Sequence, residues 1–183
     1  MAAAADRYRK VAAGFTARVR AAPAHAWDNP APCAGWVARD VVGHLVDWLS
    51  DYFFDRWGIA HPPRPSVAED PVAAWEAVDA AIQAALDDPE VATRVADTRF
   101  GPAAFEQQVD MICTGDVFLH TWDLARAAGM DERLDPDEVH AAYEGMLPYD
   151  EALRASGHYG PKVPVPDHAD EQTKLLAFIG RQV

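Results

Sequence analysis

Cysteine, long apolar runs and positive charge are all scarce in this sequence. Its two cysteines, Cys33 and Cys113, are too few for a disulfide framework and suit a reducing compartment. No apolar run approaches the roughly 20 residues that cross a bilayer, so a membrane-spanning helix is not expected. Acidic residues outnumber basic ones by 29 to 16, and the formal net charge of −13 disfavours both nucleic acid and anionic lipid as partners.

The rest of the composition favours a helical, cytoplasmic protein. The N-terminal stretch MAAAADRYRK lacks the basic start and the apolar core of a secretory signal, so we expect the cytoplasm as the location. Half of the residues are hydrophobic and alanine is frequent, whereas strict apolar alternation is hard to find. The chain can bury a sizeable core, and no repeat or low-complexity linker divides it. We therefore expect a single domain over residues 1–183.

Apolar periodicity and the positions of the prolines predict a helical bundle. Apolar stripes at helical spacing predict five or six helices, one of which Pro148 should kink or split. The long ones are expected over residues 4–22, 37–57, 71–86, 102–128 and 136–153. The tail GPKVPVPDHAD predicts an extended, polyproline-like chain before a last short helix. The expected fold class is all-α: a four-helix bundle with additional short helices and an extended Pro-rich C-terminal segment.

Two short stretches, PCAGWVARDVVGHLVDW and GDVFLHTWDLARA, each place a histidine and carboxylates on one helical face. Asp116 and His120 are four positions apart, so they are neighbours one turn apart and can chelate one divalent ion. Two protein ligands rarely hold a metal tightly, and His44 on the other stretch is the obvious third donor. We therefore predict a metal site made of His44, Asp116 and His120.

The alternative is that Asp116 and His120 form a surface pair or that the histidine is a capped core residue. Both residues flank an otherwise apolar run, VFL, in which an unpaired polar group is costly. His44 interrupts a second apolar run in the same way. A shared cation satisfies all three polar groups at once, which favours the metal site.

Four further residues lie on or near the same helical faces. Trp48 lies one turn after the first histidine and is the best pocket wall. Cys113 lies about 20° around the helix from the second histidine, so it is either a thiolate ligand or a small buried apolar residue. Asp40 is a helix-start residue, an extra ligand or an acceptor behind the ligands. Asp123 orients either a ligating imidazole or a backbone amide.

With the later stretch SGHYGPKVPVPDHADEQTKLLAFIGR, these motifs resemble the actinobacterial metal-binding proteins related to the N-terminal domain of mycothiol-dependent maleylpyruvate isomerase. That group belongs to the DinB-like four-helix-bundle superfamily. The resemblance implies a DinB-like bundle with a site of two histidines and one carboxylate, matching His44, Asp116 and His120. The isomerase has a glutamate where this chain has Asp116, which shortens that arm by one methylene. It also has a second domain for which this chain leaves no room, so maleylpyruvate isomerisation itself is not implied.

The function we expect is metal-dependent chemistry on a small molecule. Three protein ligands with an open position are the catalytic pattern for a divalent metal, with zinc as first choice and nickel or iron as alternatives. Such a metal activates a low-molecular-weight thiol for transfer to, or isomerisation of, a small electrophile, and the resemblance implies mycothiol as that cosubstrate. A metal-bound hydroxide would instead give a metal-dependent hydrolase. No general base stands out unless Asp40, Asp47 or Asp123 takes that part, so a further alternative is a non-catalytic metal-binding or dimerising module, with a homodimer as the expected assembly.

Overall fold

The computed structural model describes residues 2–183, and these form two compact units. The first unit extends to Asp131 and the second covers Glu132–Val183. Apart from one short hairpin, the regular structure of the described residues is helical, so the predicted all-α, DinB-like fold class is confirmed. None of the described helices is both long enough and apolar enough to span a membrane. A single domain over all 183 residues stays a prediction.

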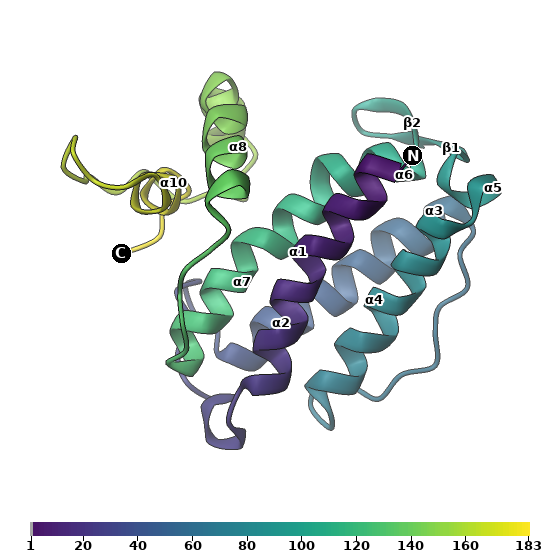
Figure 1. Ribbon diagram of the computed structural model, residues 1–183, viewed down its shortest axis with the longest axis horizontal. Helices are drawn as coiled ribbons and strands as arrows, with labels where there is room; N and C mark the ends of the chain where they lie inside the picture. Colours follow the sequence, from purple (N-terminus) through teal and green to yellow (C-terminus); the bar gives the residue numbers. More distant parts are fainter. Residues whose placement is uncertain (1) are drawn as a thin grey trace. The chain divides into compact units, whose positions relative to one another are not determined.

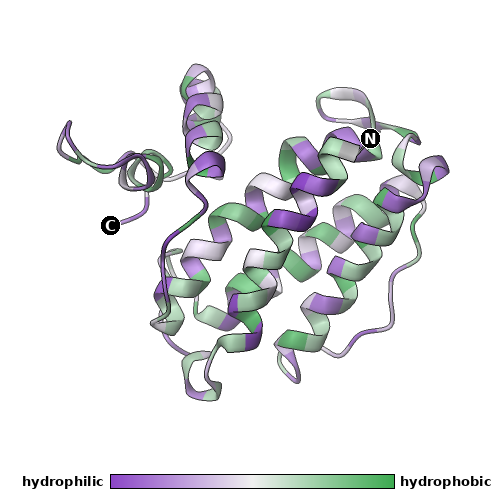
Figure 2. Cartoon of the chain, in the orientation of Figure 1, coloured by the Kyte–Doolittle hydropathy of each residue, from purple (hydrophilic) through white to green (hydrophobic). Residues whose placement is uncertain are grey.

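Four long helices build the first unit (Figure 1). They are α1 (Ala2–Ala21), α2 (Ala38–Leu49), α4 (Pro71–Asp87) and α7 (Thr114–Ala128). Helices α1 and α2 each pack against both α4 and α7, so the four surround one core. Figure 2 shows hydrophobic and hydrophilic residues mixed along each of them, as amphipathic helices require. The large side chains that fill this core include Tyr8, Phe15, Leu45, Trp75, Ile82 and Trp122.

Local signals explain where these helices begin and end. The Asp70 side chain accepts hydrogen bonds from the backbone N–H groups of Val72 and Ala73, and Pro71 occupies the first turn of α4, as the sequence predicts. Helix α7 ends at Gly129, whose φ of 67° lies in the left-handed region that favours glycine. The predicted start and end of α4 and the predicted C-terminal end of α7 are therefore confirmed within one residue.

Two of the expected long helices contain a π-helical turn. Helix α2 continues through a π turn (Ser50–Phe54) into α3 (Asp55–Trp57), and α6 (Phe105–Gln108) continues through a second one (Val109–Cys113) into α7. A π turn closes i→i+5 hydrogen bonds, so it takes up one residue more than an α turn and shifts the helical phase by roughly 100°. Such turns are frequent at functional sites.

The prediction that the fourth helix starts at residue 102 was wrong. Residues 101–104 form a strand, β2 (Gly101–Ala104), which pairs antiparallel with β1 (Val95–Thr98). Gly101 has φ 100°, a conformation that ends any helix, and the Thr98 hydroxyl accepts the N–H of Phe100 to close the turn. Two further short helices, η1 (Ala24–Ala26) and α5 (Pro89–Ala92), agree with the additional short helices expected.

The second unit contains α8 (Pro136–Met146), a 3-10 turn (Leu147–Tyr149), α9 (Asp150–Ala155) and α10 (Glu171–Phe178). Pro148 lies in the 3-10 turn, so it splits the predicted helix as expected. Helix α8 packs against α10. Residues 161–166 of the Pro-rich stretch before α10 have no regular secondary structure, and the N–H of Val163 donates to the carbonyl of Ala177.

Candidate metal centre

The predicted site residues lie between α2 and α7, which pack against each other (Figure 1). His44 and Trp48 lie one turn apart on α2, and Asp116 and His120 lie one turn apart on α7. Both helices present an apolar stripe to the core, so the polar residues at its edge are carried to the same interface. The site residues of α2 therefore lie close to those of α7.

The three predicted ligands are in contact around Asp116. Nε2 of His44 is 3.2 Å from Oδ2 of Asp116, and Nε2 of His120 is 3.6 Å from Oδ1 of the same carboxylate. One donor atom from each residue lies within 4.8 Å of the other two. Two imidazoles and one carboxylate are a donor set that zinc, nickel and iron accept. These residues therefore fit a divalent metal ion, while their assignment as ligands stays a prediction.

Asp116 is held as a carboxylate. The indole Nε1 of Trp48 donates to its Oδ2 over 2.8 Å. Burial favours the neutral acid, but the charge of His120 and the hydrogen bond from His44 outweigh it and lower the pKa of Asp116. The indole N–H of Trp48 thus orients one predicted ligand, while the role of Trp48 as a pocket wall stays a prediction.

His120 lies between two carboxylates. Its Nδ1 is 2.9 Å from Oδ2 of Asp123, one turn further along α7. Burial disfavours the imidazolium, but Asp116 and the hydrogen bond to Asp123 outweigh it and raise the pKa of His120 to about 10. Asp123 thus contacts an imidazole, which is one of the two roles predicted for it. A carboxylate at Nδ1 keeps a proton there and turns the lone pair of Nε2 toward the centre when a metal replaces the second proton.

The centre has an open and a closed side. The side chains of His44 and Asp116 are 28% and 24% exposed, whereas those of His120 and Asp123 are 8% and 0% exposed. The ring of Trp36 lies 5.1 Å from that of His44 and stacks on that of His120 at 5.8 Å. The centre is therefore more exposed to solvent on the His44 side than on the His120 side.

The closed side contains a thiol. Sγ of Cys33, in the Pro-rich connection before α2, donates to Oδ2 of Asp123 over 3.4 Å. Cys33, His120 and Asp123 form a second group whose donor atoms all lie within 4.8 Å of one another, and all three residues are buried. Sequence reasoning placed Cys33 in a loop but gave it no role in the site.

Two of the predicted extra residues lie apart from the donor groups found among residues 2–183. Oδ2 of Asp40 accepts the backbone N–H of Val37 at the start of α2, which is the helix-start role. Cys113 lies in the π turn before α7 and is fully buried. Burial and the carboxylates of Asp116 and Asp79 raise the pKa of its thiol, which disfavours a thiolate ligand.

Sequence reasoning missed Tyr52 and Gln108, which meet one to two turns beyond the centre. The Tyr52 hydroxyl donates to Oε1 of Gln108 over 3.1 Å, and the Tyr52 ring lies 5.3 Å from that of Trp48. Gln108 precedes Asp116 by eight positions, which in a regular helix leaves it about 80° off the same face. The π turn between them cancels that offset. No sequence signal marked either π turn, so a 3.6-residue period could not find this pair.

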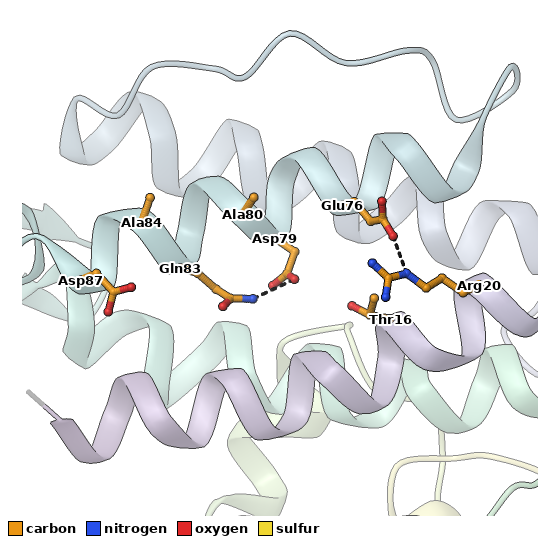
Figure 3. A pocket seen from close by; sticks show the side chains of 8 residues that line it. All are labelled: Thr16, Arg20, Glu76, Asp79, Ala80, Gln83, Ala84 and Asp87. Atoms are coloured by element: carbon orange, nitrogen blue, oxygen red, sulfur yellow. Dashed lines mark hydrogen bonds and ion pairs between the residues drawn. The ribbon is translucent and has the colours of Figure 1, made fainter.

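A second polar cluster lies between α1 and α4, beside a cavity of about 490 Å³ (Figure 3). Arg20 pairs with Glu76 at one end of it. In the middle, Asp79 accepts hydrogen bonds of 2.9 Å from both the Tyr8 hydroxyl and Nε2 of Gln83. Burial raises the pKa of Asp79 despite these two bonds. Both oxygens of Asp79 accept a hydrogen bond from a neutral protein donor, which gives this cluster a structural explanation.

Comparison with known proteins supports the family resemblance. Residues 8–54 match the family model of the mycothiol maleylpyruvate isomerase N-terminal domain. The resemblance that the sequence motifs indicate is thereby confirmed, and the matched segment includes His44 and Trp48. Two uncharacterized proteins, from two strains of Mycobacterium tuberculosis, are each 27% identical to this chain over 159 residues, which is 85% of this chain and 85% of each relative. No solved structure matches significantly.

Proposed function

We propose that the protein binds one divalent metal ion through His44, Asp116 and His120 and activates a low-molecular-weight thiol for transfer to, or isomerisation of, a small electrophile. The observation that carries this proposal is the donor geometry. One nitrogen or oxygen atom of each residue lies within 4.8 Å of the others, and the His44 side is open. Three protein ligands with an open position are typical of catalytic metal sites.

A bound divalent metal lowers the pKa of a coordinated thiol, so a thiolate nucleophile forms near neutral pH. The chain's own residues orient the predicted ligands for this. The Trp48 N–H fixes one oxygen of Asp116, and Asp123 holds Nδ1 of His120. The Trp36 ring lies against both imidazole rings and so helps to fix their positions.

Zinc is the first choice for the metal, with nickel and iron as alternatives, because two imidazoles and one carboxylate suit all three. The thiol is proposed from the family. The matching domain is that of a mycothiol maleylpyruvate isomerase, so a mycothiol-like cosubstrate is the corresponding proposal here. The site we propose lies wholly within the first unit.

A second candidate function is a non-catalytic metal-binding module. The carboxylates considered as a general base are all engaged: Asp40 with the Val37 backbone, Asp47 with Arg64 at 3.0 Å and Asp123 with His120. Metal-activated thiol chemistry needs no separate base for the thiol, whereas a hydrolase gains from one. This observation therefore ranks thiol activation and the non-catalytic module above hydrolysis.

Metal content of the purified protein tests the site. After reconstitution with zinc, wild type is expected to hold close to one metal per chain by elemental analysis, and His44→Ala and Asp116→Asn to lose it. Asp116→Glu is the matched control, because it restores the glutamate of the isomerase and keeps a carboxylate. Wild type that stays metal-free with zinc, nickel and iron would refute the proposed centre.

Thiol activation is tested on the reconstituted protein. N-acetylcysteine and mycothiol serve as probe thiols with monobromobimane as electrophile, and the rate of thiol alkylation is followed by fluorescence. We expect the metal-loaded wild type to accelerate the reaction at pH 7 and His44→Ala to leave it at the uncatalysed rate. Full metal occupancy with no acceleration for either thiol would favour the non-catalytic module.

A further inference from the structure

The buried side of His120 carries a second set of metal-type donors. Oδ2 of Asp123 is 2.9 Å from Nδ1 of His120 and 3.4 Å from Sγ of Cys33. All three atoms lie within 4.8 Å of one another. With these spacings a point equidistant from the three is roughly 2 to 2.5 Å from each, which is the range of Zn–N, Zn–O and Zn–S bonds. The donors therefore stand at coordination distance from a common centre.

We propose that Cys33, Asp123 and Nδ1 of His120 form a second metal site that selects thiophilic divalent ions such as Cd²⁺ over Zn²⁺. A thiolate is the soft ligand that the His44 centre lacks, so the two donor sets differ in metal preference. A divalent ion balances the charges of one thiolate and one carboxylate, and all three residues are buried, where an unbalanced charge is costly. The Cys33 S–H and the Nδ1 N–H give up their protons to solvent as the ion binds.

Sharing one imidazole makes the two sites exclude each other. A ring that binds an ion through Nδ1 keeps its remaining proton on Nε2, which then points at Asp116 and offers no lone pair to the His44 centre. The converse holds when Nε2 binds the ion and Nδ1 donates to Asp123. An ion bound at this second site, here called the inner site, thus prevents metal binding at the His44 centre, here called the outer centre. This competition rests on the proposed function, whereas binding at Cys33 does not.

Titration of the metal-free, reduced protein with Cd²⁺ tests the inner site. We expect an ultraviolet thiolate-to-cadmium charge-transfer band that saturates at one ion per chain. In Cys33→Ser the band should vanish and the Cd²⁺ affinity should fall by more than the roughly 10- to 100-fold that follows loss of an outer-sphere partner. Cys113→Ser, the matched thiol control, should keep the band. No band in wild type, or a band that depends on Cys113, would overturn the inner site.

Competition with Co²⁺ separates this inference from the proposed function. Co²⁺ bound at the His44 centre gives visible d–d bands, and stoichiometric Cd²⁺ is expected to abolish them in wild type but not in Cys33→Ser. His44→Ala should lose the Co²⁺ bands and keep the cadmium–thiolate band. If wild type keeps both sets of bands together, mutual exclusion is overturned. If Co²⁺ never binds while the cadmium–thiolate band persists, the proposed outer centre fails and the inner site stands.

Discussion

Asp79 and Asp116 are aspartates on inner faces of the same bundle, yet their neighbours give them opposite properties. Asp79 accepts hydrogen bonds from a tyrosine hydroxyl and a glutamine amide, both neutral, and burial raises its pKa. Asp116 lies between His44 and His120, and these imidazoles lower its pKa against the effect of burial. The two carboxylates differ in the charge that their surroundings can supply.

That difference separates a structural polar cluster from a candidate metal centre. Hydroxyl and amide donors satisfy a carboxylic acid in either protonation state, so the cluster around Asp79 needs no ion. The cluster around Asp116 gathers two imidazoles and one carboxylate, and these need a proton or a cation between them. The cavity beside Asp79 is therefore a poorer guide to function than the small, partly exposed centre at His44.

Removal of an imidazole is expected to have the largest effect on metal binding. His120→Ala is expected to abolish stoichiometric zinc binding, because the residue is a predicted ligand and links Asp116 to Asp123. Asp79→Asn should leave zinc binding unchanged. Metal per chain after reconstitution and dialysis is the measurement, and far-ultraviolet circular dichroism checks that both variants are folded. Equal metal loss in the two variants would show that the clusters do not differ in this respect.

Loss of the carboxylate behind His120 should have the next largest effect. Asp123→Asn keeps an oxygen acceptor but removes the charge that orients Nδ1, and we expect zinc affinity to fall about 10- to 100-fold. Chelator competition measures the affinity, and the Co²⁺ visible spectrum reports changed ligand geometry. Asp40→Asn is the matched control, since Asp40 serves the start of α2. A weakening of zinc binding in Asp40→Asn as large as in Asp123→Asn would contradict a specific orienting role.

The sequence predicts those parts of the centre that depend on spacing within one regular helix. His44 and Trp48 share α2, and Asp116 and His120 share α7, so a 3.6-residue period finds both pairs. The bundle follows from the same periodicity, because each amphipathic helix must bury its stripe against the others. The π turn at Val109–Cys113, which lies between Gln108 and Asp116 and changes the helical phase between them, leaves no such pattern.

The contacts of Cys33 and of Tyr8 with distant segments were not predicted, because neither contact follows from helical spacing. Cys33 and Asp123 are 90 positions apart, and Tyr8 and Asp79 are 71 apart. Periodicity places each residue on an inner face, but which side chains meet there depends on how the helices pack. The hairpin was missed because four-residue strands are too short to show alternation, and its turn depends on Gly101.

Removal of one hydrogen-bond donor from each carboxylate is expected to lower stability at Asp79 and metal affinity at Asp116. Tyr8→Phe takes the hydroxyl from Asp79 and should lower the free energy of unfolding by about 1–3 kcal/mol, because a buried acceptor loses a partner. Trp48→Phe takes the indole N–H from Asp116 and should mainly weaken zinc binding. Urea unfolding of the metal-free proteins and zinc titration measure the two effects. A Tyr8→Phe protein with weakened zinc binding would contradict the separation.

The smallest expected effect is a pH dependence at Asp79. Burial raises the pKa of Asp79 in the folded protein above its value in the unfolded chain, against the hydrogen bonds from Gln83 and Tyr8, with Glu76 adding to the shift and Arg20 opposing it. Folding therefore favours the protonated acid, and the contribution of Asp79 to stability is fully present below the unfolded pKa and is lost as pH rises through the folded pKa.

Asp79→Asn should remove this dependence, since asparagine stays neutral and its oxygen can still accept the Tyr8 hydroxyl. The wild type and the variant are expected to be closest in stability at acidic pH, and the variant should gain on the wild type as pH rises until the folded pKa of Asp79 is passed. Urea unfolding of the metal-free proteins at a series of pH values measures that difference, in which the titration of His120 and Asp116 cancels. If the difference in the free energy of unfolding does not change with pH, or changes in the opposite direction, Asp79 is held as a carboxylate like Asp116. The two clusters would then differ only in the residues around each carboxylate.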